Sequence, residues 1–235
     1  MKALQLFVFD MAGTTVNEAN LVYKTLCHAF IIAGFTELEL EDVLEYGAGK
    51  EKLQATRDIL ATVFPQAPDQ SGTAERVHAR FRELLAEAYA TSPVTAFPGS
   101  EDFLAKLRAA GIKVALNTGY DRPTAELLLS KMGWTAGVEY DVLVTATDVN
   151  RGRPHPDMIL LAMEQTGIND PALVAKVGDS AIDILEGKNA GCGFTADVTT
   201  GAQTAKQLWR AEPDAVVDEL VALLTASHLM ADLQK

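Results

Sequence analysis

The sequence predicts an α/β protein, in which a parallel sheet flanked by helices carries an inserted, all-helical segment. Short apolar runs alternate with amphipathic helical patterns over most of the chain. Between residues 16 and 92, by contrast, the patterns are helical and we find no convincing strand. Several of the apolar runs also end in a polar residue, as parallel strands that lead into a ligand-binding crevice often do.

The predicted strands are rich in β-branched or aromatic residues. They cover residues 4–9, 113–117, 142–146, 173–177 and, more weakly, 193–197. Helical patterns lie between them at 99–110, 122–133, 157–167 and 181–190. This alternation favours a parallel sheet with right-handed crossover connections.

The predicted insert contains three amphipathic helices, at 17–33, 51–64 and 74–90. Gly34 closes the first, and the pairs Ser92-Pro93 and Pro98-Gly99 end the helical pattern after the third. We therefore expect an α/β core domain at 1–15 and 93–235, and a helical cap domain at 16–92.

The composition is that of an ordinary globular protein, with 235 residues, 48% of them hydrophobic and 22% charged. A net charge of −12 makes nucleic acids and anionic membranes poor partners. An acidic protein that handles an anionic substrate needs a metal ion, Lys or Arg in its site. We expect Cys27 and Cys192 to be reduced packing residues. The first apolar run stops at Asp10 and no run has transmembrane length, so a cytoplasmic location is expected.

Acidic residues follow two of the predicted strands. Asp10 ends the first strand, whereas Asp179 and Asp183 follow the fourth. Taken singly, each segment is also typical of an N-cap. Because parallel strands share one carboxyl edge, the two segments together predict an oxygen-rich pocket, which suits Mg²⁺.

Four short motifs occur in order along the chain. They are Asp10-Met-Ala-Gly-Thr-Thr15, Thr118 at the end of a strand, Arg153 in Gly-Arg-Pro-His-Pro-Asp157, and Gly178-Asp-Ser-Ala-Ile-Asp183. With these motifs the chain resembles the haloacid dehalogenase superfamily over essentially its full length. The resemblance implies a Rossmann-like core with a helical cap inserted after the first motif.

The resemblance also implies roles for these residues. Asp10 would attack phosphorus and form an aspartyl-phosphate. Thr118 and Arg153 would bind the phosphoryl oxygens. Asp10, the Ala12 carbonyl and Asp179 would hold Mg²⁺, with Asp183 in support. Further substrate-binding candidates are Thr14, Gly47, Asn117 and Gly119.

Position 12 departs from the pattern of phosphatases in this superfamily. They carry a second Asp there, which protonates the leaving alkoxide, but this chain has Ala12. General acid–base help is worth roughly 10²–10⁴-fold in rate. The sequence Asp-X-Ala-Gly-Thr-Thr, with an arginine at the third motif, resembles the phosphonoacetaldehyde hydrolase subfamily. That resemblance implies carbon–phosphorus cleavage through a lysine Schiff base, in which no alkoxide has to be protonated.

Lys50 is the candidate for the Schiff-base lysine. It ends Gly47-Ala-Gly-Lys50, which resembles the cap motif of the subfamily. A lysine that only binds substrate and a plain surface lysine remain alternatives. Leu53 and Tyr46 stand where the subfamily has His and Met, so the substrate can differ.

The sequence thus predicts a Mg²⁺-dependent hydrolase with an aspartate nucleophile that cleaves the C–P bond of a small 2-oxoalkyl phosphonate such as phosphonoacetaldehyde. A small-molecule phosphomonoesterase is the alternative, and a non-catalytic binding protein is a third reading, disfavoured by the joint presence of the four motifs. The expected partner is a small anionic phosphorylated or phosphonate substrate, without nucleic acid or membrane. A homodimer is possible by family resemblance.

Overall fold

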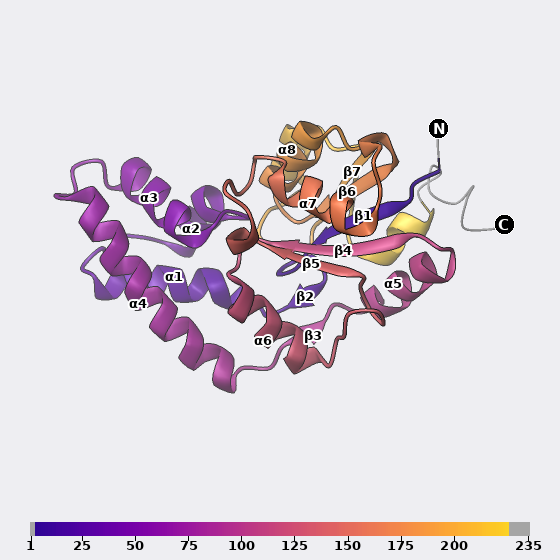
Figure 1. Ribbon diagram of the computed structural model, residues 1–235. Coiled ribbons are helices and arrows are strands. Elements are labelled where there is room, and N and C mark those ends of the chain that lie inside the picture. The colour runs from indigo at the N-terminus through magenta and orange to yellow at the C-terminus, as the bar shows by residue number, and fades with distance from the viewer. Residues whose placement is uncertain (1–2, 226–235) are drawn as a thin grey trace.

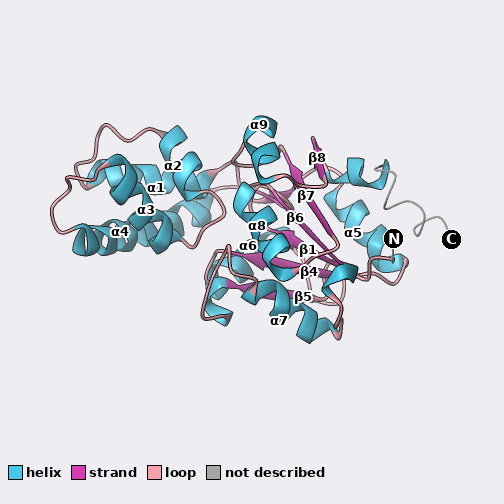
Figure 2. Ribbon diagram, turned by 90° about the horizontal axis from the view of Figure 1, so that it is seen from above, coloured by secondary structure: helices cyan, strands magenta, loops and turns pink. Residues whose placement is uncertain are grey.

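The computed structural model describes residues 3–225 and has a parallel six-stranded sheet at its centre. The strand order is β5-β4-β1-β6-β7-β8, with β1 in the middle of the sheet (Figure 2). The strands are β1 (Leu6–Asp10), β4 (Lys113–Thr118), β5 (Val142–Thr145), β6 (Val174–Gly178), β7 (Phe194–Val198) and β8 (Ala215–Val217). This sheet confirms the predicted α/β fold class.

Helices cover both faces of the sheet, which is why β1 is apolar on both faces up to Asp10 at its end. Phe7 and Phe9 face one side, where each makes an edge-to-face ring contact with Phe103. Leu6 and Val8 face the other side and pack in a core with the apolar side chains of α7. The helices around the sheet are α5 (Ser100–Ala109), α6 (Arg122–Met132), α7 (Asp157–Thr166), α8 (Ala181–Ala190) and the short α9 (Ala205–Leu208).

The segment between β1 and the rest of the sheet forms four packed helices. They are α1 (Leu21–Ile32), α2 (Leu40–Gly47), α3 (Lys52–Val63) and α4 (Gln70–Thr91). Figure 1 shows them together at one end of the molecule, beyond the carboxyl ends of the strands. None of the helices within residues 3–225 is long and apolar enough to span a bilayer.

Short elements account for the differences from the sequence-based prediction. The antiparallel ribbon of β2 (Val16–Asn17) and β3 (Thr95–Ala96) connects the helical segment to the core. The division into domains at 16 and 92, close to this ribbon, stays a prediction. The helix α2 and the edge strand β8 were not predicted, since α2 buries only Val43 and Gly47 and β8 has three half-buried residues. Short 3₁₀ helices cover Ala146–Asp148, Pro171–Leu173, Trp209–Ala211 and Leu220–Thr225.

Candidate active site

The strand order brings three of the sequence motifs to one place. β1 lies between β4 and β6, and Asp10 at its end is in register with Asn117 of β4. Thr118 therefore ends the neighbouring strand on one side, and Asp179 follows the neighbouring strand on the other. Their proximity is a consequence of topology that the spacing along the chain does not reveal.

A small pocket lies at this edge of the sheet, between the sheet and the helical segment. Five of the predicted site residues line it together, namely Asp10, Ala12, Thr118, Gly119 and Arg153. Residues from the helical segment complete the lining, namely Val22, Tyr23, Gly49 and Lys52, and Tyr120 joins them from the loop after β4. The site is therefore built from both parts of the chain.

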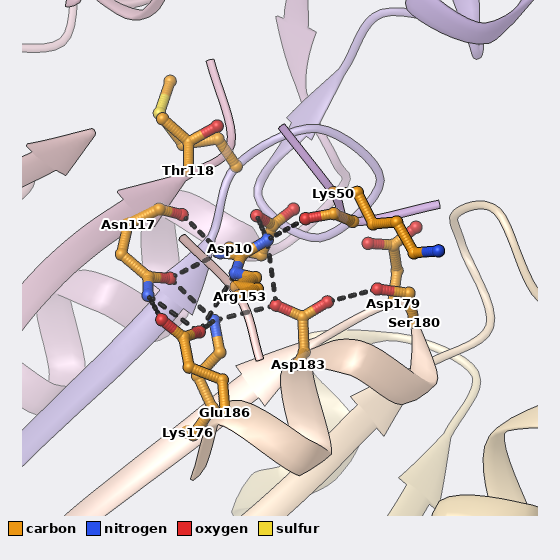
Figure 3. A network of polar contacts seen from close by, with 12 residues as sticks. Asp10, Lys50, Asn117, Thr118, Arg153, Lys176, Asp179, Ser180, Asp183 and Glu186 are labelled. Carbon is orange, nitrogen blue, oxygen red and sulfur yellow. Dashed lines mark hydrogen bonds and ion pairs between the residues drawn. The ribbon is translucent and has the colours of Figure 1, made fainter. Parts of the chain in front are cut away.

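Arg153 is held rigidly beside the predicted nucleophile (Figure 3). Its Nη1 lies 2.7 Å from Asp10 Oδ1 and 3.1 Å from Asp183 Oδ1. Its Nε donates to Glu186 at 3.0 Å, and its Nη2 donates to the Asn117 side chain at 2.8 Å. Burial opposes the charge, but the three carboxylates outweigh it and raise the pKa of Arg153 further. This guanidinium stays cationic, as an anion-binding group requires.

A second buried cation, Lys176, was not singled out by the sequence analysis. It lies inside β6 and is fully buried. Its Nζ lies 2.9 Å from Asp183 Oδ1 and donates to Asn117 Oδ1 at 2.6 Å. Glu186 on α8 completes the cluster by accepting from the Asn117 amide at 2.9 Å. A lysine within an otherwise apolar strand was the available signal, because a fully buried charge requires partners.

Asp10 lines the pocket, whereas Asp179 and Asp183 do not, but both are close enough to Asp10 to interact with it electrostatically, and the three carboxylates together suit a hard cation. Burial raises the pKa of Asp10 and of Asp179, and Asp10 and Asp183 raise that of Asp179 further by repulsion. Asp183 differs, because Arg153 and Lys176 outweigh its burial and lower its pKa. A divalent cation between Asp10 and Asp179 would relieve their repulsion.

The donor set for such a cation would be two carboxylates and a backbone carbonyl, which suits Mg²⁺. Residues 3–225 contain no group of three or more His, Cys, Asp or Glu side chains that could hold a metal. The predicted set differs from such a group because its third donor is the carbonyl of Ala12. The Ala202 amide donates to Asp179 Oδ2 at 2.6 Å and holds this carboxylate in place.

Lys50, in the turn before α3, and Lys52, the first residue of α3, have different environments. The side chain of Lys50 extends away from Asp10 and Arg153 (Figure 3), and its Nζ forms an ion pair with Asp58 at 2.5 Å. Lys52 instead lines the pocket and is only 8% exposed. Its burial lowers its pKa to about 8, even though Asp10 acts in the opposite direction. The structure thus brings Lys52, and not the Lys50 ammonium, to the pocket with Asp10.

The other predicted substrate-binding residues do not line the pocket. Gly47 packs inside the helical segment, where a Cβ would meet Ala55 at 3.4 Å. The Asn117 side chain is engaged by Arg153, as described above. Thr14 is fully buried, and its hydroxyl has no hydrogen-bond partner among the described residues.

A buried carboxyl and three tyrosines near Lys52 were also missed. Glu18 is 3% exposed, and burial raises its pKa to about 7. Tyr23, Tyr89 and Tyr120 surround the same region, and burial raises the pKa of each hydroxyl well above its usual value. Glu18 follows the first motif by only a few residues, but an acidic residue in a connecting segment is usually exposed, so no sequence pattern pointed to it.

A family model described as haloacid dehalogenase-like hydrolase matches residues 4–191. A Dickeya dadantii protein named "Probable phosphatase IndB" is 32% identical over 97% of this chain and 95% of that protein. A phosphonoacetaldehyde hydrolase of Bacillus cereus is 28% identical over 85% of this chain and 77% of its own length.

The fold is shared with solved structures. A hydrolase from Pseudomonas syringae superposes with a TM-score of 0.81 at 21% identity, over 97% of this chain and 98% of that one. A phosphonoacetaldehyde hydrolase like protein from Oleispira antarctica gives a TM-score of 0.78 at 24% identity, over 99% and 94%. At these identities the likeness supports the fold alone.

Proposed function

The chain belongs to the haloacid dehalogenase-like hydrolase family, and we propose that it is a Mg²⁺-dependent hydrolase of the C–P bond in small 2-oxoalkyl phosphonates such as phosphonoacetaldehyde. One observation carries this proposal. A buried lysine with a lowered pKa, Lys52, shares a pocket with Asp10, while position 12 lacks an acid. The phosphonoacetaldehyde hydrolases among the relatives support the same substrate class.

In this proposal Lys52 is the amine that forms the Schiff base. A neutral amine is needed to attack a carbonyl carbon. With a pKa of about 8, roughly one Lys52 in ten is neutral at pH 7, whereas an ordinary lysine is almost fully charged. The Lys50 ammonium instead forms an ion pair with Asp58, and its side chain points away from Asp10 (Figure 3).

The other groups would divide the work at phosphorus. Asp10 Oδ forms a bond to phosphorus while the C–P bond breaks, and the electron pair of that bond moves into the iminium to give an enamine. Thr118 and Arg153 hold the phosphoryl oxygens, and water then releases phosphate from Asp10. Mg²⁺, held by Asp10, the Ala12 carbonyl and Asp179, would supply charge neutralisation at the phosphoryl group. Lys176 and Glu186 fix the orientation of Asp183 and Arg153.

Borohydride trapping tests the proposal. The protein is mixed with phosphonoacetaldehyde and Mg²⁺, reduced, and examined by tandem mass spectrometry, in which fragments on either side of Glu51 distinguish the two lysines. We expect a reduced adduct on Lys52, which Lys52→Met abolishes and Lys50→Met retains. An adduct confined to Lys50 would return the role to the lysine that the sequence predicted, and no adduct at all would reject the Schiff base.

A phosphomonoesterase is the second candidate, favoured by the Dickeya dadantii relative. In that case Lys52 would bind the substrate without forming a covalent bond. Phosphate release from sugar and organic-acid phosphates would then exceed release from phosphonoacetaldehyde. Lys52→Arg separates the two functions, because a guanidinium can bind an anion but does not form the imine.

A further inference from the structure

A chain of buried hydroxyls leads from the pocket to Glu18. Tyr120 lines the pocket, and its hydroxyl lies 2.8 Å from that of Tyr89 on α4. The Tyr89 hydroxyl donates to Glu18 Oε2 at 3.1 Å, and the same oxygen accepts the Val22 amide at 2.8 Å. The side chains of Glu18, Tyr89 and Tyr120 are all buried, so water has little access to these hydrogen bonds. They join the helical segment, its connection to the core and the loop after β4.

This series of hydrogen-bonded side chains ends beside Lys52. The Lys52 ammonium lies 5.3 Å from the centroid of the Tyr23 ring and 5.8 Å from that of Tyr120. Its Nζ donates to the Lys50 carbonyl at 2.6 Å, which fixes its position at the start of α3. The hydrogen-bonded series of Glu18, Tyr89 and Tyr120, which we call the relay, and the Lys52 amine therefore reach the pocket from adjacent positions.

We propose that Glu18, acting through Tyr89 and Tyr120, supplies the proton that allows Lys52 to form its imine with the substrate carbonyl. This inference rests on the proposed function and names the acid–base group that position 12 does not provide. Tyr120 is the group that touches the substrate, and Glu18 and Tyr89 are positioning residues behind it.

The donor and acceptor roles of the two tyrosine hydroxyls depend on whether Glu18 is protonated. When Glu18 is ionised it accepts from Tyr89, which in turn accepts from Tyr120. When Glu18 is protonated it donates to Tyr89, Tyr89 donates to Tyr120, and the Tyr120 O–H becomes free to donate into the pocket. The protonation state of a carboxyl outside the pocket is thereby transmitted to the substrate.

The step balances in atoms and charge. The Lys52 nitrogen bonds to the carbonyl carbon, and the carbon–oxygen bond breaks. The oxygen leaves as water with one proton from the amine and one from Glu18 through the relay. The products are a protonated imine with one N–H and an ionised Glu18, so a neutral pair becomes an ion pair. Hydrolysis of the imine reverses each transfer.

The charges around Glu18 favour this exchange. Burial raises its pKa to about 7, with Lys52 acting against the rise, while burial lowers that of Lys52 to about 8. Because the two values differ by about one unit, the neutral pair is only about tenfold rarer than the ion pair. The groups whose charges or dipoles face Glu18 are Lys52, Tyr23, Tyr89, Tyr120 and the backbone amides of Leu21 and Val22.

The test is the rate of imine formation between pH 6 and pH 9, measured in single turnovers quenched with borohydride. Glu18→Gln keeps the shape of the side chain but cannot titrate, and Tyr89→Phe breaks the relay while leaving Glu18 in place. We expect both to slow adduct formation on Lys52 by roughly 10²–10⁴-fold. Glu18→Gln should also remove the inflection near pH 7. Glu87→Gln, an exposed carboxyl on the same helix as Tyr89, is the matched control and should behave as wild type.

The outcomes separate the two proposals. If wild-type protein gives no Lys52 adduct, the proposed function fails and the relay fails with it. If wild-type protein gives the adduct and Glu18→Gln forms it at the same rate, the relay alone is rejected. A uniform slowing of both variants with an unchanged pH profile would also reject it, because that result indicates a purely structural role.

Discussion

Replacing Lys52 with methionine should change how the stability of the protein depends on pH. Methionine keeps a long, flexible side chain in the buried position but removes the titrating amine. Wild-type protein must keep a buried ammonium at neutral pH, which costs free energy of folding, and the cost disappears when the amine is neutral. The stability difference between the two proteins should therefore vary with pH.

The magnitude follows from the lowered pKa of Lys52. Burial takes it from 10.5 in the unfolded chain to about 8 in the folded protein. Between these values the unfolded state binds more protons, so the free energy of unfolding of wild-type protein rises with pH. From pH 7 to pH 10, wild type should gain about 2–3 kcal/mol relative to Lys52→Met. Any constant offset, such as the lost hydrogen bond to the Lys50 carbonyl, cancels in this comparison.

Urea unfolding followed by circular dichroism at several pH values measures the difference. Lys50→Met removes a lysine two residues away that forms a partly exposed ion pair with Asp58, and so controls for the loss of one positive charge. If the difference in unfolding free energy between wild type and Lys52→Met changes by less than about 1 kcal/mol from pH 7 to pH 10, Lys52 does not carry the lowered pKa. Wild type should show no such gain in unfolding free energy relative to Lys50→Met. An equal gain relative to Lys50→Met would contradict the prediction, because the effect would then not be specific to the pocket.

Three further predictions concern the nucleophile, the pocket loop and the core. Asp10→Asn should lower turnover at least about 10³-fold in a phosphate-release assay, and near-normal turnover would exclude Asp10 as nucleophile. Gly49→Ala should raise KM or lower kcat, because Gly49 has φ of +69° and a Cβ there would collide with Ser180 and Ile182. Gly34→Ala serves as the control, because Gly34 also has a positive φ but is exposed, and a Cβ there would meet no other atom within 4 Å. Phe103→Ala should lower the free energy of unfolding by about 3–5 kcal/mol, since Phe103 is buried against Phe7 and Phe9, and a loss below about 1 kcal/mol would contradict the packing described here.

The fold was largely predictable because its signals are local. The strands β1, β4, β5 and β6 are mainly apolar runs that end in a polar or small residue. The helices α5, α6 and α7 each bury a set of mainly apolar side chains on one face. Elements held mainly by tertiary contacts were missed. The ribbon of β2 and β3 has two residues in each strand, so its pairing depends on segments that are far apart in the sequence.

The predicted site residues fall into two groups for a physical reason. Asp10 and Thr118 end neighbouring strands, and the sheet brings them together as the alternation of strands and helices implies, while Arg153 joins them from the loop before α7. The lysine could not be assigned in this way. Lys50 lies in the turn before the N-cap Glu51, whereas Lys52 is the first residue of α3, so only the folded backbone places one beside Asp58 and the other in the pocket.

The class of fold and the set of groups at the strand ends could thus be read from the sequence, because both depend on local pattern and on the common edge of a parallel sheet. Two features became visible only in the folded protein, namely which lysine is desolvated near Asp10, and the hydrogen-bonded chain of Glu18, Tyr89 and Tyr120. Burial and long-range contact produce both results, because a pKa depends on which atoms surround a group and not on its neighbours along the chain.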